Sequence, residues 1–376
     1  MNIFLWLLRV IVGGLFIFSG LIKAIDPSGL RYKMDEFFEV WGMHNFSKFS
    51  LVLAILMIGF EIIAGVALLL GYAQRVFSAL LLALITFFTF LTAYVLFSGK
   101  IKECGCFGDC IKISNWDTFW KDVILLVMAI ILFAYRKRLR PVLKTHFGSA
   151  AMILTAFFAF GIQVWALEHG PIVDCLPYRK GANLWQQMQP PVGCIPDSFQ
   201  TVLVYEKDGV QKEFDQTNFP WQDPSWKYVD NKTKLIREGN CNPAVKDFSL
   251  KDYDNNEHAE EILTTPGYAF LWFIRDPEKA RTDRLDRLVS LARQAQRAGV
   301  PFYILSSANR QTSEAFQQKH NLVGIDLLQV DGVASKTAMR TNPGLMLLKD
   351  GVVQEKWSFR DYPARLALNN GALELK

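Results

Sequence analysis

Five long apolar segments in the first half of the chain constrain its fold more than any other feature. Crossing a bilayer as an α-helix takes roughly 20 predominantly apolar residues. Segments of about that length lie at 3–22, 51–70, 76–97, 116–135 and 148–167. The fourth begins with Asp117, Lys121 and Asp122 and then becomes apolar. The first lacks the basic leading region and cleavage pattern of a signal peptide. The sequence therefore predicts a protein that retains all five segments and crosses a membrane several times.

Basic residues in the loops predict which face of the membrane each segment occupies. Outside the spans, Lys and Arg divide six against six between the two faces, so the total does not decide the orientation. Five of them, however, crowd the loop at 136–144 between the fourth and fifth spans, and such a cluster favours the cytoplasmic face. The N-terminus then lies in the cytoplasm and the half after residue 168 lies outside it. We expect a bacterial inner-membrane protein whose C-terminal domain is in the periplasm.

Three cysteines, Cys104, Cys106 and Cys110, crowd the loop between the third and fourth spans. In the predicted orientation all six cysteines of the chain lie in an oxidising compartment, where disulfides persist. Three interpretations are open. A zinc site would need a fourth ligand, with His44 or His169 as the nearest additions. A structural disulfide is the second interpretation, and a redox-active pair is the third.

The spacing of the loop cysteines bears on the redox interpretation. Cys104 and Cys106 flank a single glycine, and a disulfide across so short a ring would be strained and therefore oxidising. Cys110 would then act as the resolving thiol. Four lysines lie near the loop, at positions 100, 102, 112 and 121. They would either favour the reactive thiolate or anchor the protein to lipid headgroups of the bilayer.

Three ionisable residues fall in or beside the predicted spans: Arg9, Lys23 and Glu61. A carboxylate in mid-bilayer is costly if it faces lipid, so Glu61 should face the interior of the helix bundle. Arg9 and Lys23 are its candidate partners. An ion pair that fixes the register of the helices is one interpretation. A proton relay, or a contact to a quinone headgroup, is the other.

Several separated motifs of the membrane half occur together in one known family. They are Arg9 to Pro27 with its glycines, Gly59 to Gly71, the Cys104-Gly105-Cys106-Phe107-Gly108 loop, and Trp116 to Asp122. Over residues 1 to about 136 the chain resembles DoxX/MauE-type membrane proteins. The resemblance implies a four-helix membrane bundle, similar in layout to vitamin K epoxide reductase, and a redox-associated role. MauE is linked to disulfide formation in a partner enzyme. Cys110 is an addition to the family's motif.

The second half of the chain alternates strands and helices. Phe199 to Glu206 and Val210 to Phe214 flank Lys207-Asp208-Gly209, which predicts a hairpin, and residues 231–238 predict another. Further strands are expected at 268–274, 300–306, 345–348 and 352–357. Helices are expected from 277 towards 298, over 311–320 and from Lys336. This order favours an α/β domain with a mixed sheet and helices on its faces.

The order of elements over roughly 245–376 resembles the thioredoxin fold. Asn342-Pro343 matches the loop in which that family has a cis proline, so these residues either dock a partner protein or only form a turn. The paired cysteines of thioredoxins should follow the strand at 268–274, but Ile274-Arg275-Asp276-Pro277-Glu278 contains no cysteine. This domain therefore cannot run thioredoxin chemistry by itself.

These observations divide the chain into four parts. We expect a four-helix DoxX/MauE-like membrane domain at 1–140, a fifth transmembrane helix at 141–170, a β-rich periplasmic connecting region at 171–240, and a thioredoxin-like domain without the paired cysteines at 241–376. Six cysteines allow fifteen full pairings. We expect Cys194 to pair with Cys241, and we hypothesise that Cys175, just after the fifth span, reaches Cys110. Cys104 and Cys106 would then be the reactive couple.

Two functions are compatible with this organisation. The first is a membrane-bound thiol–disulfide oxidoreductase that passes electrons between periplasmic thiols and the membrane, with a quinone as acceptor by fold analogy alone. The second is a non-enzymatic scaffold that binds periplasmic or envelope proteins through its thioredoxin-like domain. Nucleic acid is not an expected partner, because the net charge of +5 is mild and no basic stripe is interleaved with aromatic residues.

Overall fold

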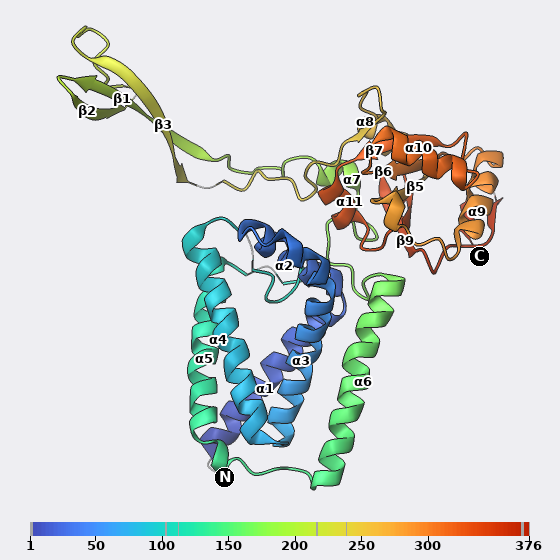
Figure 1. Ribbon diagram of the computed structural model, residues 1–376. Helices are drawn as coiled ribbons and strands as arrows, with labels where there is room; N and C mark the ends of the chain where they lie inside the picture. Colours follow the sequence, from blue (N-terminus) through green and yellow to red (C-terminus); the bar gives the residue numbers. More distant parts are fainter. Residues whose placement is uncertain are drawn as a thin grey trace.

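The protein consists of a helical bundle, a slender β-arm and an α/β domain (Figure 1). The computed structural model describes residues 3–101, 104–111, 113–215, 217–237, 239–369 and 372–375. The α/β domain sits over one end of the bundle, and the arm projects away from it. The loop with the three cysteines lies at the covered end of the bundle, so the fold brings the two halves of the chain together there.

The bundle is made of five long helices and three short ones. They are α1 (Ile3–Ala24), α2 (Pro27–Val40), η1 (His44–Phe49), α3 (Ser50–Leu70), α4 (Gln74–Ser98), α5 (Asn115–Ala134), η2 (Arg136–Arg138) and α6 (Thr145–His169). Within the described residues, α1, the continuous η1–α3 segment, α4 and α6 are long and apolar enough to cross a membrane. The fourth expected span, at 116–135, corresponds to α5 and falls outside this group because its first half is charged. Its 20 residues nevertheless run back along α4, over about 30 Å, to the end where α6 begins. The chain is a multi-pass membrane protein.

Glycines let α1 and α3 cross closely. A Cβ atom on Gly65 would lie 2.8 Å from the carbonyl oxygen of Gly13 and 3.0 Å from the backbone nitrogen of Ile17. Small residues at such crossings let helix backbones approach each other in a membrane. The crossing brings Ser19 and Lys23 of α1 beside Glu61 of α3, as described below.

Helix α2 lies across the covered end of the bundle (Figure 1). The Asp26 carboxylate caps it by accepting a hydrogen bond of 3.3 Å from the backbone nitrogen of Gly29. Pro27 takes the first helical position, where no backbone N–H is needed. Towards its other end Phe37 is buried and packs against Trp41. Together with η1, α2 therefore covers the space between α3 and α4.

The β-arm is a three-stranded antiparallel sheet. Its strands are β1 (Ser198–Lys207), β2 (Val210–Asp215) and β3 (Lys227–Arg237), in the order β2-β1-β3. The first predicted hairpin is confirmed: Asp208 and Gly209 form its turn with φ of 52° and 80°. The second predicted hairpin, over 231–238, is wrong, because residues up to 237 continue as one strand paired with β1. Glu238 lies outside the described residues.

The C-terminal domain is the predicted α/β domain. It contains α7 (Leu184–Gln187), β4 (Leu250–Lys251), α8 (Ala259–Thr264), β5 (Tyr268–Ile274), η3 (Pro277–Lys279), α9 (Leu285–Arg297), β6 (Phe302–Ser306), α10 (Arg310–Lys319), β7 (Asp326–Val330), α11 (Gly332–Ala338), β8 (Gly344–Lys349), β9 (Val352–Ser358), β10 (Leu366–Asn369) and β11 (Ala372–Leu375). The main sheet has the order β4-β7-β6-β5-β8-β9. Strands β5, β6 and β7 run parallel, and β8 and β9 form an antiparallel hairpin beside β5. This is a thioredoxin-like topology.

Two details of this domain differ from the sequence-based expectation. The single helix expected from 277 towards 298 is two pieces, η3 and α9. The break follows from a tertiary contact, because the backbone nitrogen of Arg281 donates 3.0 Å to the carbonyl of Asn342 instead of to a helical partner. In addition, Tyr178 and Leu184 are buried in the core with Phe248. Part of the expected connecting region at 171–240 therefore packs as part of the C-terminal domain.

Direct contacts join the C-terminal domain to the membrane domain. The guanidinium of Arg340 lies 2.7 Å from the carboxylate of Asp26 and also pairs with Asp109 in the cysteine loop. Arg275 donates 2.7 Å to the hydroxyl of Tyr32 on α2. The cysteine loop and the C-terminal domain thus share one face of the membrane domain, as the sequence analysis required.

Candidate redox site

The loop at 104–110 holds Cys104 and Cys106 against each other. Gly105 and Gly108 adopt φ of 71° and 59°, a region that favours glycine, and the nitrogen of Gly108 donates 3.0 Å to the carbonyl of Gly105. The turn brings the two Sγ atoms to 2.9 Å, in hydrogen-bond contact. Both cysteines are free thiols and are partly buried. A disulfide is about 2.05 Å long, so only a small movement separates this pair from a bond.

The two thiols are not equivalent. The hydrogen bond to Cys106 lowers the pKa of Cys104 from 9.0 to about 7, and the backbone N–H of Cys106, 3.4 Å from Cys104 Sγ, acts in the same direction. The same hydrogen bond, together with burial, raises the pKa of Cys106 well above its usual range. Above about pH 7 the pair therefore holds mainly one thiolate, on Cys104, and one proton, on Cys106. The thiolate is the attacking form of a cysteine.

A buried ion pair lies next to the thiols. Lys23 Nζ is 2.5 Å from Glu61 Oε1, and both side chains are at most 2% exposed. The hydroxyl of Ser19 lies 3.1 Å from Glu61 Oε2 and 3.1 Å from the carbonyl oxygen of Cys106, so it can donate to either. Ser19, which the sequence analysis did not single out, thus connects the ion pair to the cysteine loop.

The other candidate partner of Glu61, Arg9, has a different role. Its guanidinium donates to the carbonyl oxygens of Leu68 at 2.6 Å, Leu69 at 2.5 Å and Arg140 at 3.0 Å. These carbonyls lie at the opposite end of α3 from the cysteine loop. Arg9 therefore closes the end of the α1–α3 crossing and does not take part in the candidate redox site.

A second ion pair, on α5, also lies near Cys106. Lys121 Nζ is 2.8 Å from Asp122 Oδ1 and 4.4 Å from the centre of the Phe107 ring. Of the four lysines considered near the loop, Lys102 and Lys112 lie outside the described residues, and Lys100 is exposed. Lys121 is the lysine whose charge acts on both thiols. Within the part of the chain that the structure describes, no group of three or more His, Cys, Asp or Glu side chains is placed to hold a metal ion.

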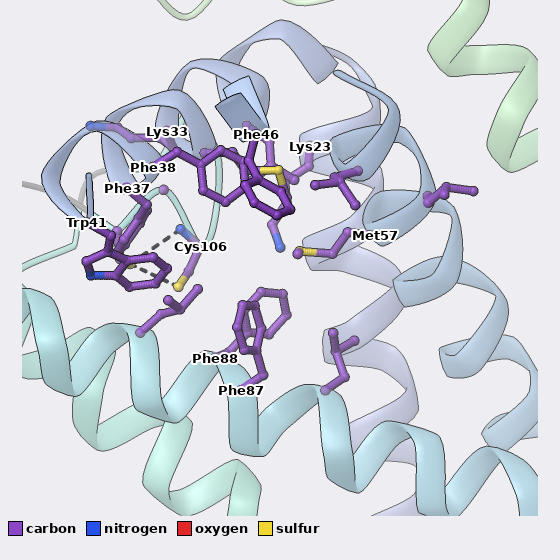
Figure 2. Close-up of a pocket in the computed structure, with 18 of the residues that line it drawn as sticks. Lys23, Lys33, Phe37, Phe38, Trp41, Phe46, Met57, Phe87, Phe88 and Cys106 are labelled. Atoms are coloured by element: carbon purple, nitrogen blue, oxygen red, sulfur yellow. Dashed lines mark hydrogen bonds between the residues drawn. The ribbon is translucent and has the colours of Figure 1, made fainter. Parts of the chain in front are cut away.

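A large apolar cavity opens beside the thiols. Its volume is about 610 Å³, within the range of about 300–1,000 Å³ typical of small-molecule sites. Figure 2 shows aromatic side chains from α2, η1 and α4 around it, with Cys106 in its wall and the ammonium of Lys23 pointing into it. Cys104 also lines it. The sequence signal for this cavity was the aromatic stretch at 37–46, which no predicted span explained.

The remaining four cysteines form two disulfides. Cys194 is bonded to Cys241 at the base of the β-arm, and Cys110 is bonded to Cys175. These are the pairings favoured by the sequence analysis. The alternative in which Cys110 acts as a resolving thiol does not match this state, because its disulfide to Cys175 would first have to be broken. The second disulfide also ties the cysteine loop to the segment that follows α6.

The loop before β8 has the geometry expected from the thioredoxin resemblance. The bond between Asn342 and Pro343 is cis. The side chain of Asn342 donates 2.8 Å to the carbonyl of Asp276, and Pro343 is buried. The neighbouring Arg340 contacts the cysteine loop through Asp109. This flank of the loop therefore faces the protein's own membrane domain.

Comparison with known protein families matches two separate parts of the chain. Residues 1–135 match the family described as methylamine utilisation protein MauE, and residues 199–238 match a domain of unknown function (DUF8463). No curated protein matches the chain.

Two solved structures show some similarity to the chain. Reduced Prx3 from Vibrio vulnificus is 17% identical over 30% of this chain and 82% of its own, with a TM-score of 0.25. A thioredoxin-like protein from Bacteroides caccae is 11% identical over 83% of this chain and 78% of its own, with a TM-score of 0.21. These scores are too low to add to the topology described above. The family match, by contrast, covers α1 to α5 together with the loop of Cys104 and Cys106. The chain thus joins a MauE-type membrane domain, which carries a close thiol pair, to a thioredoxin-like domain without paired cysteines.

Proposed function

We propose that this protein is a thiol–disulfide oxidoreductase of the bacterial inner membrane, which passes electrons from periplasmic thiols through Cys104 and Cys106 to a membrane quinone. One observation carries the proposal: the close pair of free thiols forms part of the wall of an apolar cavity of about 610 Å³ inside the membrane domain. A thiol pair that served only to staple the loop would not need such a cavity beside it.

The residues around the cavity suit a quinone. Phe37, Trp41 and Phe88 offer apolar aromatic faces to a flat ring. Lys23 Nζ lies 4.8 Å from the centre of the Phe88 ring and supplies a cationic hydrogen-bond donor for a carbonyl oxygen. Phe87, at the rim, is exposed on the surface that would face lipid, so a lipophilic molecule could enter from the bilayer. When bound, a quinone would accept two electrons and two protons.

The thiol pair would perform the exchange with the substrate. In the oxidised protein, a thiolate of a partner protein attacks the Cys104–Cys106 disulfide and forms a mixed disulfide with Cys104, while Cys106 leaves and is protonated. A second thiol of the partner then displaces Cys104. The partner gains a disulfide, and the pair gains two electrons and one proton, with Cys106 as a thiol and Cys104 as a thiolate. Because the pKa of Cys104 is lowered, its thiolate is a good leaving group in that second step.

The C-terminal domain would orient the partner protein. It has no cysteine after β5, and it is tied to the cysteine loop through Arg340 and the Cys110–Cys175 disulfide. Part of the Asn342-Pro343 loop is already engaged with its own domain, so a periplasmic or envelope protein would dock on the remaining exposed surface beside it. The same observation supports the second candidate function, a scaffold in which the domain binds envelope proteins without electron transfer.

Anaerobic oxidation of the purified protein separates the two functions. The full chain would be reduced, placed in lipid nanodiscs and mixed with a short-chain ubiquinone or a naphthoquinone. Trapping of free thiols followed by mass spectrometry would report Cys104 and Cys106. We expect stoichiometric quinol formation with loss of both thiols, and no reaction in Cys104→Ser or Cys106→Ser. The double variant Cys194→Ser/Cys241→Ser, which removes a distant disulfide, should react normally. If neither quinone oxidises the wild-type pair, electron transfer to a quinone is excluded and the scaffold becomes the better-supported function.

A further inference from the structure

A small cavity lies beside the cysteine loop, separate from the large apolar one, and half of the twelve residues in its wall are polar or ionisable. Its volume is about 20 Å³, and a water molecule needs about 10–15 Å³ of such space and two to four polar partners. The polar or ionisable residues in its wall are Ser19, Lys23, Glu61, Cys106, Lys121 and Asp122. The cavity is therefore large and polar enough for one water beside the protonated thiol.

Two carboxylates line this cavity, Glu61 and Asp122, and they differ in whether both of their oxygens have a partner. The Oδ1 atom of Asp122 pairs with Lys121, whereas its Oδ2 atom is buried and has no hydrogen-bond partner within the described chain. The side chain is only 2% exposed. A buried carboxylate oxygen without a partner is costly, which points to a ligand such as water at this position. Glu61 differs, because Lys23 and Ser19 contact its two oxygens.

We infer that Asp122, through a water in this cavity, accepts the proton that Cys106 releases when the thiol pair is oxidised. This inference rests on the proposed function. Closing the pair forms the bond between the two sulfurs, transfers two electrons to a quinone, which takes up two protons from water, and releases the single proton held by Cys106. The proton passes to the water, and the water passes one of its own to Asp122 Oδ2.

The charges around the cavity favour such a transfer. Lys23 from α1 and Lys121 from α5 are cationic, while Glu61 from α3 and Asp122 from α5 are anionic. Adding the Cys104 thiolate gives the group a net charge of −1. If the Cys106 proton left the protein before the electrons did, the group would carry a charge of −2 in a region of low dielectric constant. Moving that proton to Asp122 keeps the total at −1 until the electrons leave.

The test compares Asp122→Asn with wild type and two further variants. Asparagine keeps the size of the side chain but cannot take the proton, whereas Asp122→Glu keeps a carboxylate and should restore most of the rate. Asp117→Asn is the matched control, because Asp117 lies on the same helix but is exposed and is hydrogen-bonded to Ser114. The readout is the rate of thiol closure by a short-chain quinone between pH 6 and pH 9, in the full chain in nanodiscs.

We expect Asp122→Asn to slow closure at pH 7 by at least about tenfold, since a positioned proton acceptor contributes about 10²–10⁴-fold. The deficit should shrink as the pH rises and hydroxide replaces the carboxylate. Alkylation of Cys104 at pH 7 should be equal or faster, because the negative charge of Asp122 raises the pKa of Cys104. This second readout separates loss of the proton acceptor from loss of the folded loop.

Two outcomes would overturn the inference: an unchanged rate and pH profile in Asp122→Asn, or an Asp122→Glu variant as slow as Asp122→Asn. The same rates would also be measured with diamide, a thiol oxidant that closes the disulfide without a quinone. This second oxidant makes the test independent of the proposed function. If wild type ignores quinones but Asp122→Asn still slows diamide closure, the quinone proposal falls and the proton acceptor stands. If quinones oxidise all variants at the same rate, the proton-acceptor inference falls and the quinone proposal stands.

Discussion

The difference between the two thiols gives a quantitative prediction. The pKa of Cys104 is lowered from 9.0 to about 7, chiefly by its hydrogen bond with Cys106. At pH 7 about half of Cys104 is then thiolate, against about 1% for a thiol with a pKa of 9. Replacing Cys106 with alanine removes the main cause and leaves burial, which acts in the opposite direction. We therefore expect Cys106→Ala to slow alkylation of Cys104 at pH 7 by about 50-fold or more.

The assay follows alkylation by iodoacetamide, an uncharged reagent, between pH 5.5 and pH 10. Because the other four cysteines are in disulfides, alkylation in the unreduced protein reports only Cys104 and Cys106. In wild type the rate should rise about tenfold between pH 6 and pH 8 and level off above that. In Cys106→Ala it should still be rising at pH 9. Cys106→Ser is the matched control, since its hydroxyl keeps a donor and should give an intermediate midpoint.

A wild-type midpoint near 9, or a midpoint that Cys106→Ala leaves unchanged, would refute the assignment of the thiolate to Cys104. The quinone and proton-acceptor proposals would then lose the asymmetry on which their order of steps depends.

Three further predictions concern the scaffold around the site. Lys23→Met leaves the Glu61 carboxylate buried without its lysine partner and should destabilise the membrane domain by about 3–5 kcal/mol in denaturant titrations. Adding Glu61→Leu in the same chain removes the buried charge and should restore most of the lost stability. Gly65→Ala forces apart two helix backbones and should cost about 1–3 kcal/mol in the same titrations, whereas Gly14→Ala, which meets open space, should not. Arg340→Ala removes the cation that pairs with the partly buried Asp26 and with Asp109 in the cysteine loop. We therefore expect faster hydrogen exchange at 104–111 and faster reduction of the Cys110–Cys175 disulfide. The control variant Arg310→Ala, at an exposed arginine, should change neither rate.

Much of the fold could be predicted because its signals are local. Spans of 20 apolar residues, the turn at Asp208-Gly209 and the apolar strand at 268–274 each depend on a few consecutive residues. The position of Glu61 in mid-span also predicted an internal partner. What the sequence could not decide was which partner, because Arg9 and Lys23 sit on the same helix and only the register of α1 against α3 selects Lys23.

The parts that could not be predicted depend on contacts between distant segments. The break between η3 and α9 arises from a hydrogen bond to Asn342, some 60 residues away. The apolar cavity requires α2 and η1 to fold over the space between α3 and α4, which no periodicity in either segment encodes. Asp122 was visible as a charge at the start of a span, but only the packing of α5 beside the cysteine loop places its free oxygen at a water-sized cavity.

The attachments of the cysteine loop limit how electrons could reach it. Cys110 is bonded to Cys175, Asp109 is paired with Arg340, and the carbonyl of Cys106 contacts Ser19. A loop held at three points cannot swing out to collect electrons as a mobile carrier would. The C-terminal domain cannot carry them either, because it has no cysteine pair and is bonded through Cys175. In the proposed function the partner's thiols must therefore come to Cys104, and the fixed C-terminal domain would act by selecting which proteins can approach.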